Sequence, residues 1–507
     1  MARDGAFVDR FKAALEAAGL ELTADEASGV EKLASWMHDG LAAQVLASTP
    51  TRQDDSICDL DIVALGARLR DGRLTAKALT EATLGRIAER DPAYLSFYRV
   101  LEDDALADAV RADRELADGI DRGPLHGIPV GIKDVIDVAG VPTTANAPGR
   151  ADATADSDAE VVRRLRSAGA VIIGKLATYE WATVGPDKRG LFPPARNPWN
   201  LDHITGGSSS GCAAAVAGGL VRTSIGTDTG GSVRGPSFYC GTVGLKPTLG
   251  SVPTVGVLDL APSLDHVGTV SATVAEAALT LDVLTGRAGQ EAAGSRLGEP
   301  LSGLRIGYAR NWFAHDPQTM PEIVVAIDAA VSELSRLGAA VNEVEMPHYA
   351  DIEVAVAAIL HAESFKLHAG NLRDHPQDYG RRAYLSLAAG LALSDAELAK
   401  AHDAGAVFRA SINDLLDEHD VLITVGALTT ALPAAPFEKE AQWTPMRTIG
   451  FNVSGHPVLA LPVGFHAGLP IGMQIIGRHN EESRIVQFGH AYERATDIHL
   501  QRPPGPR

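Results

Sequence analysis

The chain has 507 residues, and 45% of them are hydrophobic, which excludes a globally disordered protein. Its 45 Lys and Arg against 64 Asp and Glu leave a net charge of −19, which excludes a general binder of nucleic-acid backbones. Three cysteines, Cys58, Cys212 and Cys240, suggest no disulfide framework and match no zinc motif, so we expect a reducing compartment. We find no signal-peptide core and no apolar run of 18 residues, and therefore expect a soluble cytoplasmic protein that binds no membrane.

The first 50 residues are expected to form a small helical appendage. Apolar residues from Phe7 to Leu20 follow a period near 3.6, and Thr23 with Glu26 forms a capping box that opens a second helix. The polar segment 48–56 resembles a linker, so we divide the chain into an appendage, 1–50, and a main domain, 51–507. The appendage is a separate helical unit or, alternatively, a docking or dimerisation element, which allows a homodimer.

Helical and strand-like segments alternate from Leu60 onward. The expected helices span 75–90, 102–118, 157–169 and 321–337. The β-rich segments are 127–141, 170–175, 304–310, 339–347, 420–436 and 456–477. Within the third helix, Ser157 is expected to be the N-cap and Gly169 the stop. The alternation predicts an α/β layered core, and the Gly-rich polar stretch 285–302 is expected to be a surface loop.

Two near-matches to catalytic or binding motifs fail. GAVIIGKL resembles a phosphate-binding loop, but Lys175 is followed by Leu, and β-branched residues between the glycines favour a strand. GSSSG fits the nucleophile elbow G-x-S-x-G with Ser209 as nucleophile, but an elbow needs a strand directly before it, and Pro198 and its turn-forming neighbours argue against one. The His that such a triad needs would be His456, which heads an apolar strand and is better explained as structural.

The stretch SIGTDTGGSVRG is a better candidate for a nucleophile. Gly230 and Gly231 directly precede Ser232, so backbone N–H groups can turn inward and hold an oxyanion beside the Ser232 hydroxyl. Asp228 and Arg234 flank the turn and could pair to fix its shape. The alternative is a Gly-rich turn with an incidental serine.

Lys133 is the candidate base for Ser232. It lies in the apolar run IPVGIKDVIDV, where burial would lower its pKa and favour the neutral amine. The alternative is a lysine that points outward or pairs with Asp134 or Asp137.

Together these segments resemble the amidase signature family. The resemblance is carried by GIPVGIKD at 127–134, GGSSSGCAAAVAGG at 206–219, GTDTGGSVRG at 226–235 and CGTVGLKPT at 240–248. It extends over about residues 60–500 and implies a single large mixed sheet flanked by helices, with the N-terminal appendage outside it.

The resemblance also implies a Ser–cis-Ser–Lys triad. In that triad Ser232 is the nucleophile, Ser208 the bridging serine with a cis peptide bond, and Lys133 the base. The residues whose amides would form the oxyanion hole are Thr229, Gly230, Gly231 and Ser232. No metal and no organic cofactor is implied. Ser210 and Cys212 depart from the residues common at these positions in the family, and the sequence offers no explanation for either.

The activity that the resemblance implies is hydrolysis of a small-molecule linear amide, or of a related carbamate or urea, through a serine acyl-enzyme. By position, Trp181, Ala182 and Thr183 are candidates for substrate contacts, with ordinary core packing as the alternative. A second interpretation is the A subunit of a glutamine-dependent tRNA amidotransferase, which needs partner subunits. We rank it lower because the loop at 286–302 and the appendage do not fit its usual pattern. A third is a non-catalytic binding protein on the same fold.

Overall fold

The computed structural model describes residues 57–440 and 442–505, which all belong to a compact unit that begins at Asp55. The helices expected within residues 1–50 lie outside the described residues. The boundary at residue 50 and the homodimer therefore stay predictions.

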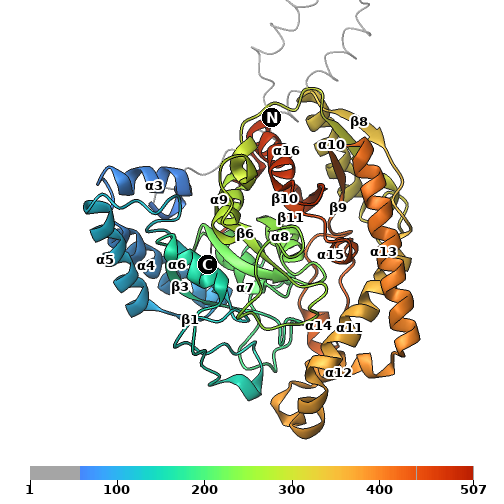
Figure 1. Ribbon diagram of the computed structural model, residues 1–507, viewed down its shortest axis with the longest axis horizontal. Coiled ribbons are helices and arrows are strands. Elements are labelled where there is room, and N and C mark those ends of the chain that lie inside the picture. The colour runs from blue at the N-terminus through green and yellow to red at the C-terminus, as the bar shows by residue number, and fades with distance from the viewer. Residues whose placement is uncertain (1–56, 441, 506–507) are drawn as a thin grey trace, which may run out of the picture. The chain divides into compact units, whose positions relative to one another are not determined.

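A mixed sheet of eleven strands runs through the described part of the chain (Figure 1). Its strand order is β1-β3-β2-β4-β6-β5-β10-β11-β9-β7-β8. The strands are β1 Phe97–Val100, β2 Pro129–Lys133, β3 Val171–Leu176, β4 Thr223–Asp228, β5 Val243–Lys246, β6 His266–Ser271, β7 Arg305–Tyr308, β8 Ala340–Glu343, β9 Val421–Val425, β10 Val458–His466 and β11 Leu469–Ile476. This architecture confirms the single large mixed sheet.

Helices surround the sheet. They are α3 Ile62–Arg70, α4 Ala76–Tyr94, α5 Glu102–Ala117, α6 Glu160–Ser167, α7 Ser210–Ala217, α8 Arg234–Cys240, α9 Val274–Thr285, α10 Pro321–Arg336, α11 Tyr349–Asp374, α12 Arg381–Ala388, α13 Asp395–Glu418, α14 Ala435–Lys439, α15 Gly450–Val453 and α16 Glu482–Ala495. Helices α7 and α8 contact each other and the central strands, while α9, α10 and α16 form a second group. Helices α11 and α13 pack along one another outside the sheet (Figure 1).

The parallel pairing of β2 with β4 positions the expected base beside the Gly-rich turn. Val130 is paired with Thr223 and Ile132 with Ile225. Parallel strands end at the same edge of a sheet, so the carboxyl end of β2, with Lys133, lies beside the end of β4. Ligand sites of open α/β sheets commonly lie at the carboxyl ends of strands.

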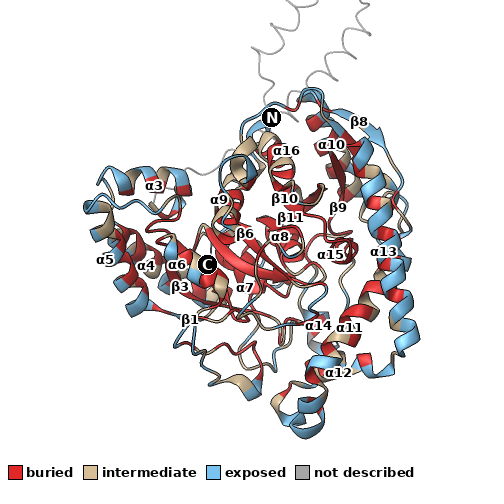
Figure 2. Ribbon diagram, in the orientation of Figure 1, coloured by how far each residue is buried: buried red, intermediate tan, exposed pale blue. Residues whose placement is uncertain are grey.

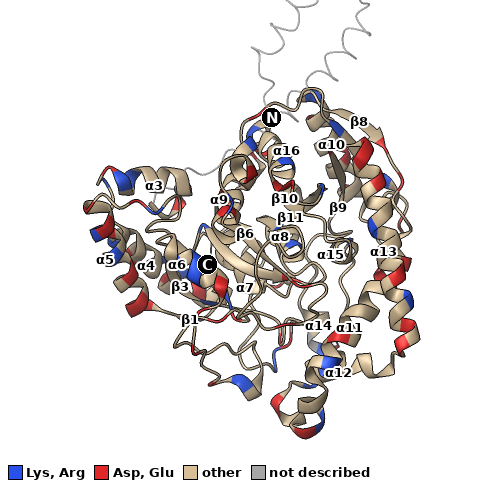
Figure 3. Ribbon diagram, viewed as in Figure 1, with Lys and Arg blue, Asp and Glu red and all other residues tan. Residues whose placement is uncertain are grey.

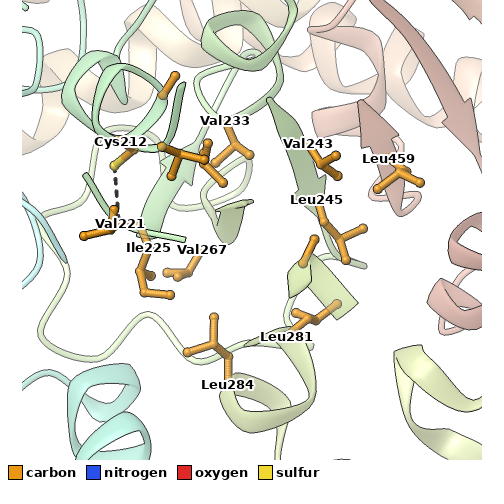
Figure 4. Packing of buried hydrophobic residues seen from close by; sticks show 14 of the residues in the cluster. Cys212, Val221, Ile225, Val233, Val243, Leu245, Val267, Leu281, Leu284 and Leu459 are labelled. Carbon is orange, nitrogen blue, oxygen red and sulfur yellow. Dashed lines mark hydrogen bonds between the residues drawn. The ribbon is translucent and has the colours of Figure 1, made fainter. Parts of the chain in front are cut away.

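Apolar side chains from strands and helices hold the end of β4 in place. Figure 4 shows Ile225 of β4 and Val267 of β6 packed with Val233, Leu245 and Leu281. All five are at most 1% exposed. Figure 2 shows the central strands buried and the outer faces of the surrounding helices exposed. The strand that leads to Ser232 is therefore part of the rigid core.

Several local predictions can be compared with the structure. The segments around β7, α10 and β8 form the expected βαβ unit, in which Ile306 pairs with Val341 in parallel. The N-cap prediction at Ser157 is wrong, because α6 begins at Glu160 with Ala159 at the cap position. Gly169 follows the helix with φ +75°, as expected for a stop. The 285–302 segment is not a plain loop, since two short 3₁₀ turns lie within it, Gly289–Glu291 and Ala293–Arg296.

Charged residues of both signs are spread over the outer helices, whereas the central strands carry few (Figure 3). Among the residues that the structure describes, no helix is both long and apolar enough to cross a bilayer.

Candidate active site

Lys133 ends β2 and is completely buried. Its Nζ lies 2.8 Å from Ser208 Oγ and 2.7 Å from Thr227 Oγ1. Asp134, the expected alternative partner, is 3.0 Å from the Nζ of Lys175 instead. Lys133 therefore neither points outward nor pairs with Asp134, and its amine reaches Ser208, the first serine of the GGSSSG run at 206–211.

Burial lowers the pKa of Lys133 to about 8, and the negative charges of Asp228 and Asp265 oppose this shift. A neutral amine can accept a proton from Ser208 while it still donates to Thr227. The local environment thus makes Lys133 a usable base near neutral pH.

Ser208, the expected bridging serine, is held in place by close packing around its backbone. The Gly207–Ser208 peptide bond is cis. A Cβ atom on Gly207 would lie 2.1 Å from the ring of Tyr179, so only glycine fits at this position. The amide of Tyr179 also donates to the carbonyl of Ser208 at 3.2 Å. Together these contacts fix the Ser208 side chain beside Lys133.

The other two serines of the run have structural contacts. Ser209 is buried, and its hydroxyl donates to the carbonyl of Thr227 at 3.1 Å, while its amide donates to the Ser232 carbonyl at 3.1 Å. Ser210 begins α7, and its hydroxyl donates to the carbonyl of Ala177 at 3.3 Å. Both therefore fasten the run to its surroundings, which explains Ser210, the position that the sequence left open.

Asp228 organises the turn that carries Ser232. Its carboxylate accepts hydrogen bonds from the amide of Gly231 at 2.8 Å and from the amide of Val233 at 3.1 Å. It also pairs with Arg234 at 2.9 Å, as the sequence suggested, and with Asn452 Nδ2 at 2.9 Å. Although burial raises the pKa of Asp228, Arg234 and Asn452 outweigh it and hold this pKa far below its usual range. The carboxylate is therefore ionised and rigid.

The Gly231 amide thus already has a hydrogen-bond partner in Asp228. The oxyanion hole of Thr229, Gly230, Gly231 and Ser232 amides stays a prediction, and we take the amides of Thr229, Gly230 and Ser232 as its leading candidates. Aspartate side chains commonly accept hydrogen bonds from nearby backbone amides in turns, so the D-T-G-G stretch contained a sequence signal for this bond.

Segment 448–452 supports the turn from a distant part of the chain. Thr448 Oγ1 donates to the carbonyl of Gly230 at 2.7 Å, and its own carbonyl accepts from Arg234 at 2.8 Å. Sequence reasoning missed Thr448 and Asn452, because neither belongs to a local motif.

A cavity of about 620 Å³ opens onto the turn, and both Ser208 and Ser232 line it. Ala182 and Thr183 line it as well, whereas Trp181 does not. Trp181 instead packs against His368, with ring centroids 4.5 Å apart, and Tyr379, at 5.7 Å. The sequence did not find the lining residues Leu260, Tyr349, Leu360, His361, Leu385, Ser386, Trp443 and Ile449.

His456 has the structural environment that its sequence context suggested. Burial lowers its pKa to about 2, and its Nε2 lies 2.9 Å from Asn413 Oδ1. Within residues 57–440 and 442–505, no group of three or more His, Cys, Asp or Glu side chains has the arrangement of a metal site.

The comparisons with known proteins agree with the family that the sequence motifs suggest. The family model described as Amidase matches residues 78–486, and the chain belongs to the amidase signature family.

Two kinds of protein, amidotransferase A subunits and a peptide amidase, resemble the chain over nearly its whole main domain. The A subunit of the glutamyl-tRNA(Gln) amidotransferase of Chloroflexus aggregans is 35% identical over 481 residues, which cover 88% of this chain and 98% of that protein. The native peptide amidase of Stenotrophomonas maltophilia is 30% identical with a TM-score of 0.76, over 88% of this chain and 98% of that one. The A subunit of the Thermotoga maritima glutamyl-tRNA(Gln) amidotransferase is 29% identical with a TM-score of 0.71, over 87% and 96%. The sequence motifs rank the amidotransferase interpretation below the stand-alone amidase, and the names of these relatives do not support that ranking.

Proposed function

We propose that the protein cleaves a linear amide, or a related carbamate or urea, through an acyl-enzyme on Ser232. The observation that carries this proposal is the buried Lys133–Ser208 contact of 2.8 Å at the wall of a cavity that Ser232 also lines. A buried lysine beside a serine hydroxyl has the environment of an activating base.

The reaction starts with proton transfer. Neutral Lys133 takes the proton of Ser208, Ser208 takes that of Ser232, and the Ser232 oxygen attacks the carbonyl carbon. The amides of Thr229, Gly230 and Ser232 stabilise the developing oxyanion. The proton returns along the same relay to the leaving nitrogen, so the C–N bond breaks and an ester to Ser232 remains. Water then hydrolyses this ester, and Ser232 regains its proton.

The cavity sets the scale of the substrate. Its volume of about 620 Å³ falls within the range that holds drug-sized ligands. Ala182 and Thr183 lie on its wall and are our candidates for substrate contacts. This cavity supports a small-molecule substrate.

The A subunit of an amidotransferase is a second candidate function, and the name of the 35% identical relative favours it. The Ser232 chemistry would be the same, with glutamine as the amide and with partner proteins that use the released ammonia. The two functions differ in what the isolated chain does. A stand-alone amidase releases ammonia or amine from a panel of amides without help, whereas a component of an amidotransferase co-purifies with partners from its native source and needs them for the transfer reaction.

Labelling by a fluorophosphonate probe tests the shared chemistry. We expect the probe to label the purified protein, Ser232→Ala to abolish labelling and Lys133→Ala to reduce it severely. Ser209→Ala is the matched control, since Ser209 belongs to the same run but bonds to the backbone. Labelling that survives in a folded Ser232→Ala protein would refute the assignment. A wild-type protein that is never labelled would instead support a non-catalytic binding protein.

A further inference from the structure

Asp265 lies immediately before β6 and links two segments that line the cavity. Its Oδ1 accepts a hydrogen bond from Thr229 Oγ1 at 2.5 Å. Its Oδ2 accepts from the amides of Leu260 at 2.9 Å and Ala261 at 3.1 Å. Thr229 and Leu260 both line the cavity, so one carboxylate joins two of its walls.

The turn that carries Ser232 is thus held by two carboxylates. Asp228 binds its later part through the amides of Gly231 and Val233. Asp265 binds its beginning through Thr229, whose hydroxyl would otherwise be free to rotate. Since oxyanion stabilisation depends on donors that are already in place, the position of Thr229 bears directly on the reaction rate.

Building on the proposed function, we infer that Asp265 is a positioning residue for amide cleavage. It fixes Thr229 and the Leu260–Ala261 wall around the nucleophile turn.

The charge of Asp265 adds an electrostatic effect to this positioning role, because it opposes the lowering of the Lys133 pKa by burial. Burial raises the pKa of Asp265 to about 6, so the group is a carboxylate at neutral pH and above. Thr227, which contacts Lys133, lines a void of about 10 Å³ together with Thr229 and Asp265. Such a void has room for about one water molecule, so bulk water does not screen the interaction strongly.

The other groups near Lys133 and Asp265 do not mask the effect of the Asp265 charge on Lys133. The charge of Asp228 also raises the pKa of Lys133, but that charge is paired with Arg234. The Cys212 thiol of α7 is neutral, because burial raises its pKa to about 12. The remaining neighbours of Lys133 are the hydroxyls of Ser208 and Thr227. Those of Asp265 are the Thr229 hydroxyl, the amides of Leu260 and Ala261, and the charge of Asp259. Removal of the Asp265 charge should therefore lower the pKa of Lys133.

The rate of fluorophosphonate labelling, followed across the pH range in which Lys133 titrates, tests the inference in the full-length protein without a known substrate. In Asp265→Asn we expect labelling to slow by about tenfold or more, and the pH midpoint of its rise to move down by about half a unit. In Thr229→Val, which removes the hydroxyl but keeps the Asp265 charge, we expect slower labelling with an unmoved midpoint. Asp259→Asn removes a nearby exposed charge and should change neither quantity.

A folded Asp265→Asn protein with the wild-type rate and midpoint would overturn the inference. If Asp265→Asn does not fold, a wild-type rate in Thr229→Val would overturn the positioning role on its own. Failure of the proposed function gives a different result, because the wild-type protein would then not be labelled at Ser232 at all.

Discussion

Lys133 can act as a base only while its amine is neutral, which makes the rate depend on pH in a defined direction. Because burial lowers its pKa to about 8, most of the amine is protonated below that pH and cannot accept a proton from Ser208. We expect kcat/KM, or the fluorophosphonate labelling rate, to rise with pH with a midpoint near 8. A rate that does not change across this range would contradict the role of Lys133.

The residues of the site differ in how far the sequence reveals them. Lys133, Ser208 and Ser232 could be proposed because each belongs to a recognisable local pattern. Thr227 lies inside the same pattern, yet its contact with Lys133 depends on the register between β2 and β4, which a pattern does not contain. Thr448 reaches Gly230 from 218 residues away, and only the folded chain brings the two together.

At the scale of elements, the turn between β4 and α8 depends on glycine at position 231. Its φ is +125°, and a Cβ atom there would lie 2.3 Å from Thr448 Oγ1. We expect Gly231→Ala to slow Ser232 labelling by about a hundredfold or more, because Thr448 and the turn must separate. Gly250→Ala is the control, since Gly250 also has a positive φ, +77°, but has open space around it. Equal labelling rates in the two variants would show that the Thr448 contact is unimportant.

Element boundaries depend on tertiary contacts that no capping pattern contains. Ser157 has the residue type of an N-cap, but α6 begins three residues later. The amide of Ala159 donates to the carbonyl of Asp137, and Asp158 accepts from the amide of Ala139. These bonds tie the chain to the segment after β2 until Ala159, so the helix can begin only beyond it. The βαβ unit of β7, α10 and β8 was easier to predict, because its apolar periodicity is long and uninterrupted.

Glu493 of α16 couples the packing of two helices to pH. Its carboxylate accepts from the amide of Val274, the first residue of α9, at 3.1 and 3.2 Å. Burial raises its pKa from 4.5 to about 8. A carboxyl group whose folded-state pKa is raised stabilises the fold at low pH, and this contribution is lost as pH rises from 4.5 through 8.

We therefore expect Glu493→Gln to gain stability relative to the wild type as pH rises through this window, by up to about 5 kcal/mol. The measurement is the free energy of unfolding of both proteins at several pH values. The control is Glu291→Gln, at an exposed glutamate. A difference between wild type and Glu493→Gln that stays constant with pH would show that Glu493 titrates normally.

At the scale of the whole molecule, the resemblance predicted the family and the fold correctly. It did not distinguish a stand-alone amidase from the A subunit of an amidotransferase. The proposed amide cleavage by Ser232 would serve a stand-alone amidase and a component of an amidotransferase equally, so the residues of the turn are compatible with both. The difference lies in surfaces that contact partners, and such surfaces follow no local spacing rule. The comparisons accordingly favour different members. The name of the 35% identical relative favours the amidotransferase subunit. The structural similarity is higher to the peptide amidase, with a TM-score of 0.76, than to the amidotransferase subunit, with 0.71.

The described unit contains every residue that we assign to catalysis, from Lys133 to Thr448, and it begins at Asp55. We expect a chain that starts at Asp55 to fold and to label at Ser232 within about twofold of the full-length rate, because the relay and the turn are held by contacts inside this unit. The measurements are a thermal unfolding curve and the labelling rate of both chains, and Ser232→Ala in the shortened chain is the control. A shortened chain that folds but labels slowly would show that residues 1–54 contribute to the site. Comparing the oligomeric state of the two chains by light scattering then tests dimerisation through the appendage, since a dimer that persists without it must use another surface.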